Sequence, residues 1–396
     1  MDVNHSDQLS AGVEPIGASS SSAASVSSVS MVLGLLILFL PLLSQLVLWI
    51  RRQRQRKLAT RFPVLQKLFP PSLPPPNEKA LKEMTRQNNS SRQRRKCLTA
   101  AHRGGASCFA PENTLHAFQK ALDSGVELLE LDVRTSKDGH LFLLHDPTLE
   151  RTTNGFGMAG DKTLKELQSL DAGHHFSPNP QDHTACYPLR NKGHRIPTLA
   201  EVFDLVDSNT NREVCFLLDI KDERAVEPTL ALVKERGLEE RVILGAVVPS
   251  VNDLVRRHKP AHVPLCPHYR ATLWFFLLSF LRLHWLVPFQ HDIFGTIYGA
   301  NVDKALQARG NKLSWRIFKL IGRAFLFDKE GILVNDRVVK HAHSLGKMLF
   351  VFGADLDEAP HIRRCMRLGV DCVMSDRPDF LMKIVKEEEE GGAKIE

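Results

Sequence analysis

The segment VELLELDVRTSKDGHLFLLHD, residues 126–146, holds two apolar runs separated by a turn signal. Side chains alternate between the two faces of a β-strand, so Glu130 and Asp132 in the first run share one face. Two carboxylates side by side repel each other unless a cation lies between them. The spacing therefore indicates a cation site, and the alternative interpretation is a pair of solvated acids at the end of a strand.

The turn between the two runs predicts which residues face each other. Asp138-Gly139 is typical of the centre of a two-residue hairpin. Counting back from that centre pairs Ser136 with Leu141 and Asp132 with His145. This register predicts a histidine beside the two carboxylates.

Short apolar runs alternate with amphipathic helical stretches from residue 97 onward, a pattern typical of a parallel barrel or a doubly wound sheet. The predicted strands are CLTAAH (97–102), VELLELDV (126–133), LFLLH (141–145), VCFLLDI (214–220), RVILGAV (241–247), ILVN (332–335), MLFVF (348–352) and DCVMS (371–375). The predicted helices cover residues 112–123, 164–170, 199–206, 226–236 and 338–345. The fold class is therefore α/β.

Two further strand ends carry residues suited to phosphate chemistry. His102 and Arg103 follow the first predicted strand, while Asp219 and Lys221 lie at the end of another. A third carboxylate without accompanying thiols favours a hard cation, Mg²⁺ or Ca²⁺, over zinc. Arg103 and Lys221 add positive charge for a phosphate, and a pair of histidines suits general acid and general base catalysis. For His102 alone, a structural role is the alternative interpretation.

The motifs around these residues occur together in a known family. The runs AHRGGASCFAPENTLHAF (101–118) and ELDVRTSKDGHLFLLHDPTLERTTNG (130–155) resemble the glycerophosphodiester phosphodiesterase family, specifically its membrane-anchored animal branch. RIPTLAEVFDLV (195–206), LLDIK (217–221) and GVDCVMSDRPDFL (369–381) are similar to later parts of that family. The resemblance therefore extends over nearly the whole domain.

The resemblance implies a TIM-type (β/α) barrel over residues 96–385, with a small insertion at about 147–212. The implied site consists of the acid/base pair His102 and His145, the phosphate-binding residues Arg103 and Lys221, and the metal ligands Glu130, Asp132, Asp219 and His145. Glu112 and Asn113 of the PENT motif would shape a loop, with Asn113 capping the next helix. Two positions depart from the family pattern. Phe350–Ala354 stands where many members carry Trp-Thr-Val-Asn, and Asp219 stands where bacterial relatives carry Glu.

The N-terminal part of the chain has a different composition. Residues 1–30 are rich in Ser and Ala and are predicted to be disordered. Met31–Ile50 is an uncharged apolar run of 20 residues, long enough to cross a hydrocarbon core as a helix. A basic and proline-rich linker is predicted over 51–95, and a disordered acidic tail over 386–396.

The basic cluster RRQRQRK, residues 51–57, follows the apolar run directly. By the positive-inside rule, it predicts a single-pass membrane protein with its catalytic domain in the cytoplasm. Glycosylation sequons at Asn88 and Asn89 are relevant to the alternative, lumenal orientation. The basic segment has no interleaved aromatics, so we expect a lipid partner and no nucleic acid. Seven cysteines without a CxxC pair make a disulfide framework or a zinc site unexpected.

A second apolar segment, Leu273–Phe289, is interrupted by Arg282 and His284. Its aromatic side chains suit a membrane interface, which favours a segment that dips into one leaflet. A buried core helix is the alternative interpretation.

The expected activity is metal-dependent hydrolysis of glycerophosphodiesters to glycerol 3-phosphate and an alcohol. A lysophospholipase D that releases lysophosphatidic acid is one alternative. A catalytically silent lipid-binding scaffold is another. The attacking group is either water or the 2-hydroxyl of the substrate.

Overall fold

The computed structural model describes residues 97–106, 109–177, 189–190, 192–208, 214–281, 291–298 and 333–393. The predicted disordered N-terminus, the membrane-spanning run 31–50 and the linker 51–95 lie outside these residues. Within the described ranges, no helix combines the length and the apolar character needed to cross a bilayer.

The described strands form one sheet. They are β1 (Leu98–Ala101), β2 (Leu128–Thr135), β3 (Leu141–Leu143), β4 (Cys215–Ile220), β5 (Val242–Gly245), β6 (Ile293–Ile297), β7 (Met348–Phe352) and β8 (Cys372–Ser375). Their order is β5-β4-β2-β1-β8-β7-β6, with β3 paired to β2. β3 runs antiparallel to β2, and the other pairs are parallel.

A short extended segment connects the two outer strands of this order. Leu265 forms a parallel bridge with Leu244 of β5. The amide of Asp292, one residue before β6, donates a hydrogen bond to the Leu265 carbonyl at 3.1 Å. The sheet therefore returns on itself between β5 and β6, which is consistent with the predicted TIM-type barrel.

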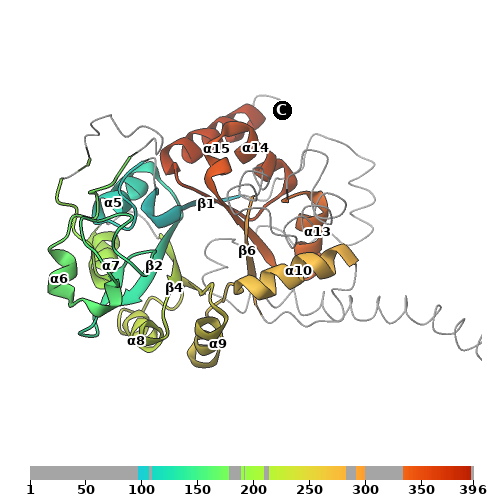
Figure 1. Ribbon diagram of the computed structural model, residues 1–396. Helices are drawn as coiled ribbons and strands as arrows, with labels where there is room; N and C mark the ends of the chain where they lie inside the picture. Colours follow the sequence, from blue (N-terminus) through green and yellow to red (C-terminus); the bar gives the residue numbers. More distant parts are fainter. Residues whose placement is uncertain are drawn as a thin grey trace, which may run out of the picture. The chain divides into compact units, whose positions relative to one another are not determined.

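Helices follow the strands in alternation and lie around them (Figure 1). The longer ones are α5 (Leu115–Ser124), α7 (Leu199–Ser208), α8 (Val226–Glu235), α9 (Pro249–His258), α10 (Tyr269–Leu281), α13 (Asp336–Ser344), α14 (Ala359–Leu368) and α15 (Pro378–Ala393). Short helices are η1 (His102–Gly104), η2 (Ala159–Asp161), α6 (Leu164–Gln168), η3 (Glu223–Ala225) and η6 (Ala354–Asp357). All five predicted helices are present, with ends shifted by a few residues.

Alternate side chains of the parallel strands pack together on the inner face of the sheet. Leu128 of β2 and Leu217 of β4 belong to an apolar cluster there. Because side chains alternate, Glu130 and Asp132 continue the face of Leu128, and Asp219 continues that of Leu217. Asp132 lies opposite Asp219 in the β2–β4 register. The carboxylates therefore gather at the carboxyl ends of the strands, next to the apolar interior.

The insertion is shorter than predicted. It contains η2 and α6, and its side chains form a small core with Phe142 and Leu144 of the preceding hairpin: Leu149, Ala159, Leu167, Ala172 and Ile196. The predicted end at residue 212 is wrong, because Val202 and Phe203 of α7 are buried in the main core together with Phe216 of β4. The insertion ends near Thr198, whose side chain accepts a hydrogen bond from the Glu201 amide at 3.1 Å and so caps α7.

One predicted strand is wrong and one strand was missed. In the described part of ILVN, residues 333–335 form no strand, and the Asn335 side chain caps α13. The position beside β7 belongs instead to β6. Its sequence, IFGTI, contains a glycine and a threonine that weaken the apolar pattern.

The acidic tail is helical for most of its length. The prediction of disorder from residue 386 is wrong as far as Ala393, where α15 ends. Arg363 of α14 donates hydrogen bonds to Glu387 at 2.7 Å and to Glu388 at 3.0 Å. These pairs and the helix propensity of glutamate extend α15 beyond its buried part.

The second apolar segment begins within α10, and residues 282–290 lie outside the described ranges. Phe275 is fully buried, and its ring stacks on Phe294 of β6 with 4.0 Å between centroids. Trp274 is 56% exposed. One face of α10 thus packs in the core, as the alternative interpretation expected, while Trp274 faces outward.

Candidate active site

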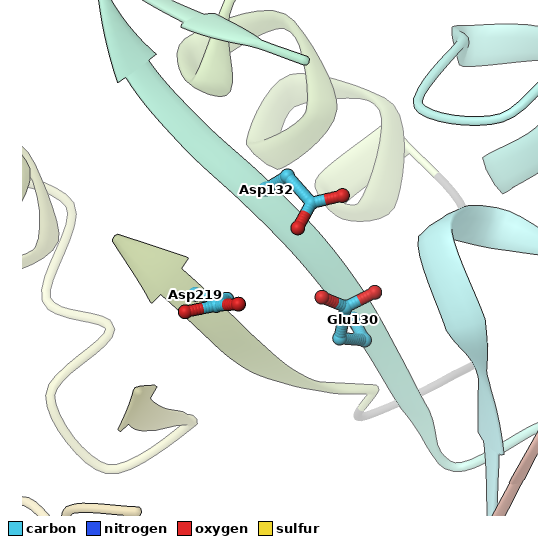
Figure 2. Close-up of side chains that lie close together, drawn as sticks. All are labelled: Glu130, Asp132 and Asp219. Carbon is cyan, nitrogen blue, oxygen red and sulfur yellow. The ribbon is translucent and has the colours of Figure 1, made fainter. Parts of the chain in front are cut away.

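Three carboxylates from two strands form the centre of the site. Glu130 and Asp132 of β2 and Asp219 of β4 each bring an oxygen to within 4.8 Å of the others (Figure 2). Glu130 is 5% exposed and Asp132 is fully buried. So many acids removed from water destabilise one another unless positive charge compensates them.

Two cationic side chains supply part of that charge. The ammonium of Lys221 lies 2.8 Å from Asp132 Oδ1 and also pairs with Asp219. The guanidinium of Arg103 lies 3.3 Å from Asp132 Oδ2. The backbone amide of Arg103 donates a 2.8 Å hydrogen bond to Glu130. The structure therefore brings both predicted phosphate-binding residues to the carboxylates.

The two neighbouring acids on β2 differ in their ionisation. Burial, together with the charge of Asp132, raises the pKa of Glu130 to about 7. Burial also opposes ionisation of Asp132, but the charges of Lys221 and Arg103 outweigh it and lower the pKa of Asp132. Glu130 is therefore the less readily ionised of the two carboxylates.

A divalent cation fits this group. Asp219 Oδ1 is buried without a hydrogen-bond partner, so one oxygen of this residue is left unsatisfied. Oxygen-only donors of this kind suit Mg²⁺ or Ca²⁺. Imidazole nitrogens could join this group of ligand atoms within 4.8 Å, but neither nitrogen of His145 does. The structure therefore does not place His145 with the three carboxylates as a ligand.

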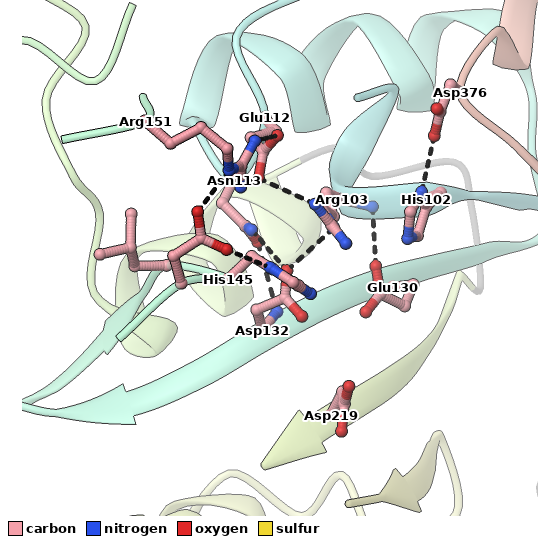
Figure 3. A network of polar contacts seen from close by, with 12 residues as sticks. His102, Arg103, Glu112, Asn113, Glu130, Asp132, His145, Arg151, Asp219 and Asp376 are labelled. Atoms are coloured by element: carbon pink, nitrogen blue, oxygen red, sulfur yellow. Dashed lines mark hydrogen bonds and ion pairs between the residues drawn. The ribbon is translucent and has the colours of Figure 1, made fainter. Parts of the chain in front are cut away.

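His102 leaves the end of β1 and lies next to Glu130 (Figure 3). Its Nδ1 is 2.6 Å from Asp376 Oδ1, at the start of the loop after β8, and its ring lies 6.2 Å from the Phe352 ring. Burial alone would lower the pKa of His102, but the hydrogen bond to Asp376 and the charge of Glu130 outweigh it and raise that pKa. The surroundings of His102 therefore shift the imidazole toward its protonated form.

His145 follows β3 on the other side of Asp132. The predicted register is wrong by one residue. Leu141 pairs with Thr135 instead of Ser136, and the backbone carbonyl of Asp132 accepts a hydrogen bond from the Leu144 amide instead of facing His145. His145 still comes close to the site, with Nδ1 2.6 Å from Asp146 Oδ1. Burial lowers the pKa of His145 despite the charge of Asp132, so its neutral form is favoured.

The PENT loop holds the carboxylate end of β2 through Asn113. Asn113 has a φ of 54°, and its side-chain amide donates a 2.7 Å hydrogen bond to Asp132 Oδ2. The prediction that Asn113 caps the next helix is therefore wrong, and Thr114 caps α5 instead. Arg103 has a φ of 53° and accepts the Asn113 amide at its carbonyl, 2.9 Å away. Two residues in this uncommon conformation next to each other are typical of a functional site.

Three polar residues of the network were missed at the sequence level. Asp146 follows His145 in the sequence. Asp376 follows the last strand and Arg151 lies in the insertion (Figure 3). Their position at strand ends was the available signal for the two aspartates. Arg151 had no such signal, because it lies in the insertion and its partner Glu112 is 39 residues away in the sequence.

Comparison with known proteins agrees with this geometry. The sequence profile of the glycerophosphoryl diester phosphodiesterase family matches residues 102–259. The chain is 39% identical over 299 residues to a glycerophosphodiester phosphodiesterase of Caldanaerobacter subterraneus subsp. tengcongensis, and the aligned region covers 74% of this chain and 98% of that protein.

Solved structures with similar folds include two phosphodiesterases. A glycerophosphoryl diester phosphodiesterase domain from Mycobacterium tuberculosis has a TM-score of 0.56 at 20% identity, covering 73% of this chain and 98% of that one. An Oleispira antarctica phosphodiesterase in complex with the product sn-glycerol-3-phosphate has a TM-score of 0.50 at 19% identity, covering 73% and 96%. At these identities the structural matches support the fold.

A parallel α/β sheet with acids, histidines and cations at its strand ends has its polar site where barrel enzymes carry their catalytic residues. The chain belongs to the glycerophosphoryl diester phosphodiesterase family, because its alignment covers nearly the full length of a relative that is 39% identical. It is therefore an enzyme, a glycerophosphodiester phosphodiesterase.

Proposed function

We propose that the protein hydrolyses glycerophosphodiesters to glycerol 3-phosphate and an alcohol, and that it uses Mg²⁺ or Ca²⁺ to do so. The observation that carries this proposal is the buried group of Glu130, Asp132 and Asp219 at the strand ends. These three carboxylates would hold the cation. When bound, the cation supplies positive charge that stabilises the phosphoryl oxygens as they become more negative.

Arg103 and Lys221 bind and orient the phosphate. Both already contact the carboxylates, so their charges lie at the place where the substrate must sit. Arg103 and Lys221 place positive charge beside the three carboxylates, and a divalent cation would add more. That positive charge supports an anionic substrate such as a singly charged phosphodiester.

The two histidines divide the proton transfers. His102, whose protonated form is favoured, donates a proton to the oxygen of the leaving alcohol. His145, whose neutral form is favoured, accepts a proton from the attacking hydroxyl. That hydroxyl belongs to water or to the 2-position of the substrate glycerol, and the same two side chains serve either route.

The pairing of His102 with Asp376 gives a pH prediction. In Asp376→Asn the hydrogen bond that raises the pKa of His102 is weakened, so that pKa falls. His102 then loses its proton at lower pH, and the alkaline limb of the kcat/KM profile moves to lower pH. Asp379→Asn, at an exposed aspartate paired with Arg377, is the matched control. A pH profile that is the same in Asp376→Asn and wild type would contradict this role of Asp376.

A second candidate activity is lysophospholipase D, with release of lysophosphatidic acid from lysophospholipids or N-acyl lysophosphatidylethanolamine. The observation that favours it is a set of exposed apolar side chains: one shortly after β5, one at the end of β6 and one at the start of α10. Val247 and Tyr269 are each 52% exposed, and Ile297 is 56% exposed. Such side chains suit a substrate with one acyl chain.

Head-group release from two substrates distinguishes these activities. For the glycerophosphodiesterase, we expect turnover of water-soluble glycerophosphoinositol that exceeds turnover of lysophosphatidylcholine. The reverse order would favour lysophospholipase D. Release from neither substrate, in the presence of Mg²⁺ or Ca²⁺, would contradict both and favour the lipid-binding scaffold.

We also propose that the enzyme is anchored in a membrane, as in the animal branch of the family, with its catalytic domain in the cytoplasm. The apolar run Met31–Ile50 and the basic cluster at residues 51–57 support this placement. In sealed membrane vesicles whose cytoplasmic face points outward, an added protease should digest the catalytic domain. Glycosylation at Asn88 or Asn89 would contradict the orientation.

A further inference from the structure

Arg151, in the insertion, connects two parts of the site. Its Nη1 donates a 2.7 Å hydrogen bond to Glu112 Oε2, and its Nη2 donates one of the same length to Glu112 Oε1. Its Nε donates to Asp146 Oδ2. The other oxygen of Asp146 lies 2.6 Å from His145 Nδ1. One guanidinium therefore holds a carboxylate that in turn holds the ring of a proposed acid/base group.

The turn that carries Arg151 is itself well fixed. Leu149 is 1% exposed and belongs to the small core of the insertion. The Leu149 amide donates to the Gly157 carbonyl at 3.1 Å, and the Thr153 hydroxyl donates to the Leu149 carbonyl at 2.7 Å. Arg151 thus extends from a rigid support, and its side chain is 46% exposed.

Glu112 is the second anchor of the guanidinium. Its side chain is 6% exposed, and it also accepts a 3.1 Å hydrogen bond from Arg103. Arg103 in turn lies beside Asp132. An unbroken chain of ion pairs therefore connects His145, through Asp146, to the phosphate-binding and carboxylate residues. Figure 3 shows its part from Arg151 through Glu112 and Arg103 to Asp132.

We infer that Arg151 is a positioning residue for His145 and acts through Asp146. Anchored at Glu112, the guanidinium fixes the Asp146 carboxylate, and Asp146 fixes the tautomer of the imidazole by accepting the Nδ1 proton. Nε2 is then the nitrogen left to accept a proton from the attacking hydroxyl. The insertion thereby contributes to the chemical step without touching the substrate. This inference rests on the proposed role of His145.

The first test replaces Arg151 and measures kcat and KM separately. We expect Arg151→Ala to lower kcat about 10- to 100-fold, the usual effect of removing such a partner. KM should change much less, because Arg103 keeps its own contacts with Glu112 and Asp132. Arg151→Lys should recover little, since an ammonium cannot form the three-pronged contact. Arg195→Ala, at another insertion arginine paired with Glu201, is the control and should keep wild-type kcat.

A double-mutant cycle tests whether Asp146 transmits the effect. In an Asp146→Asn background, the added Arg151→Ala change should leave kcat nearly unchanged, because the residue it acts through is already altered. An equal fall in kcat in both backgrounds would overturn the inference. An unchanged kcat in Arg151→Ala would overturn it too.

Two further measurements separate positioning from folding and from the proposed function. Millimolar guanidinium should restore part of the lost kcat to Arg151→Ala and none to Asp146→Asn. Thermal unfolding measures how much of the Arg151→Ala protein is folded. If its activity falls only in proportion to the folded fraction and guanidinium does not restore it, Arg151 has a structural role and the inference is overturned. Full activity in His145→Ala would instead remove the proposed role of His145. If the single variant His145→Ala has a lowered kcat and the single variant Arg151→Ala keeps the wild-type kcat, only the role of Arg151 is contradicted.

Discussion

Replacement of His102 by alanine is expected to lower turnover at least ~100-fold, the scale of a lost acid/base group. The leaving alcohol then has no proton donor in place, because His102 is the imidazole whose protonated form Asp376 and Glu130 favour. KM should change less than kcat, since Arg103 and Lys221 still bind the phosphate. The measurement is steady-state release of the head group by the purified full-length chain.

His140→Ala provides the matched control. His140 lies in the turn between β2 and β3, and its side chain is 59% exposed. This substitution should leave kcat at the wild-type value. Wild-type turnover in His102→Ala would defeat the proposed proton transfers.

Removal of divalent cations is expected to lower turnover by on the order of 10³-fold, since a bound metal is worth several kcal/mol of charge stabilisation. Without the cation, Lys221 and Arg103 are the cationic side chains beside Asp132, and Lys221 also pairs with Asp219. Burial and the charge of Asp132 raise the pKa of Glu130 to about 7, so its ionised form gains from an added cation. Dialysis against a chelator, followed by assay with added Mg²⁺ or Ca²⁺, measures the effect. Activity should return with the cation.

Asp219→Asn tests the same point without a chelator. It should raise the cation concentration needed for half-maximal activity, because one anionic ligand is lost. Asp204→Asn is the control, since Asp204 is 60% exposed and pairs with Arg236 on the surface. Full activity after chelation, or equal cation requirements in the two variants, would contradict cation dependence.

Period-two alternation was enough to predict the centre of the site. It placed Glu130 and Asp132 on one face, and parallel strands brought Asp219 of β4 directly opposite Asp132. The same rule did not give the hairpin register. Ser136 donates to the Asp138 side chain at 2.6 Å and accepts from the His140 amide at 2.9 Å, which makes the loop longer than a two-residue turn. Side-chain hydrogen bonds of this kind are not visible in an apolar pattern.

Contacts between distant segments account for the other differences. Nothing local indicates that Asp376 would bond to His102, 274 residues away. Arg151 is likewise paired with Glu112 across 39 residues. Both side chains act on the histidines through tertiary contacts, and such contacts depend on how the loops at the strand ends fold over one another. The missed strand β6 belongs to the same category, since pairing with β7 stabilises it despite its weak apolar pattern.

The central claim is that one divalent cation binds between three carboxylates of β2 and β4. Anomalous diffraction from crystals soaked in Mn²⁺ measures this most directly. We predict a single strong peak at roughly 2–2.6 Å from oxygens of Glu130, Asp132 and Asp219, the range for hard cations with oxygen ligands. The Lys221 ammonium should then move away from Asp132. No peak at saturating Mn²⁺, with Lys221 still between Asp132 and Asp219, would contradict the account.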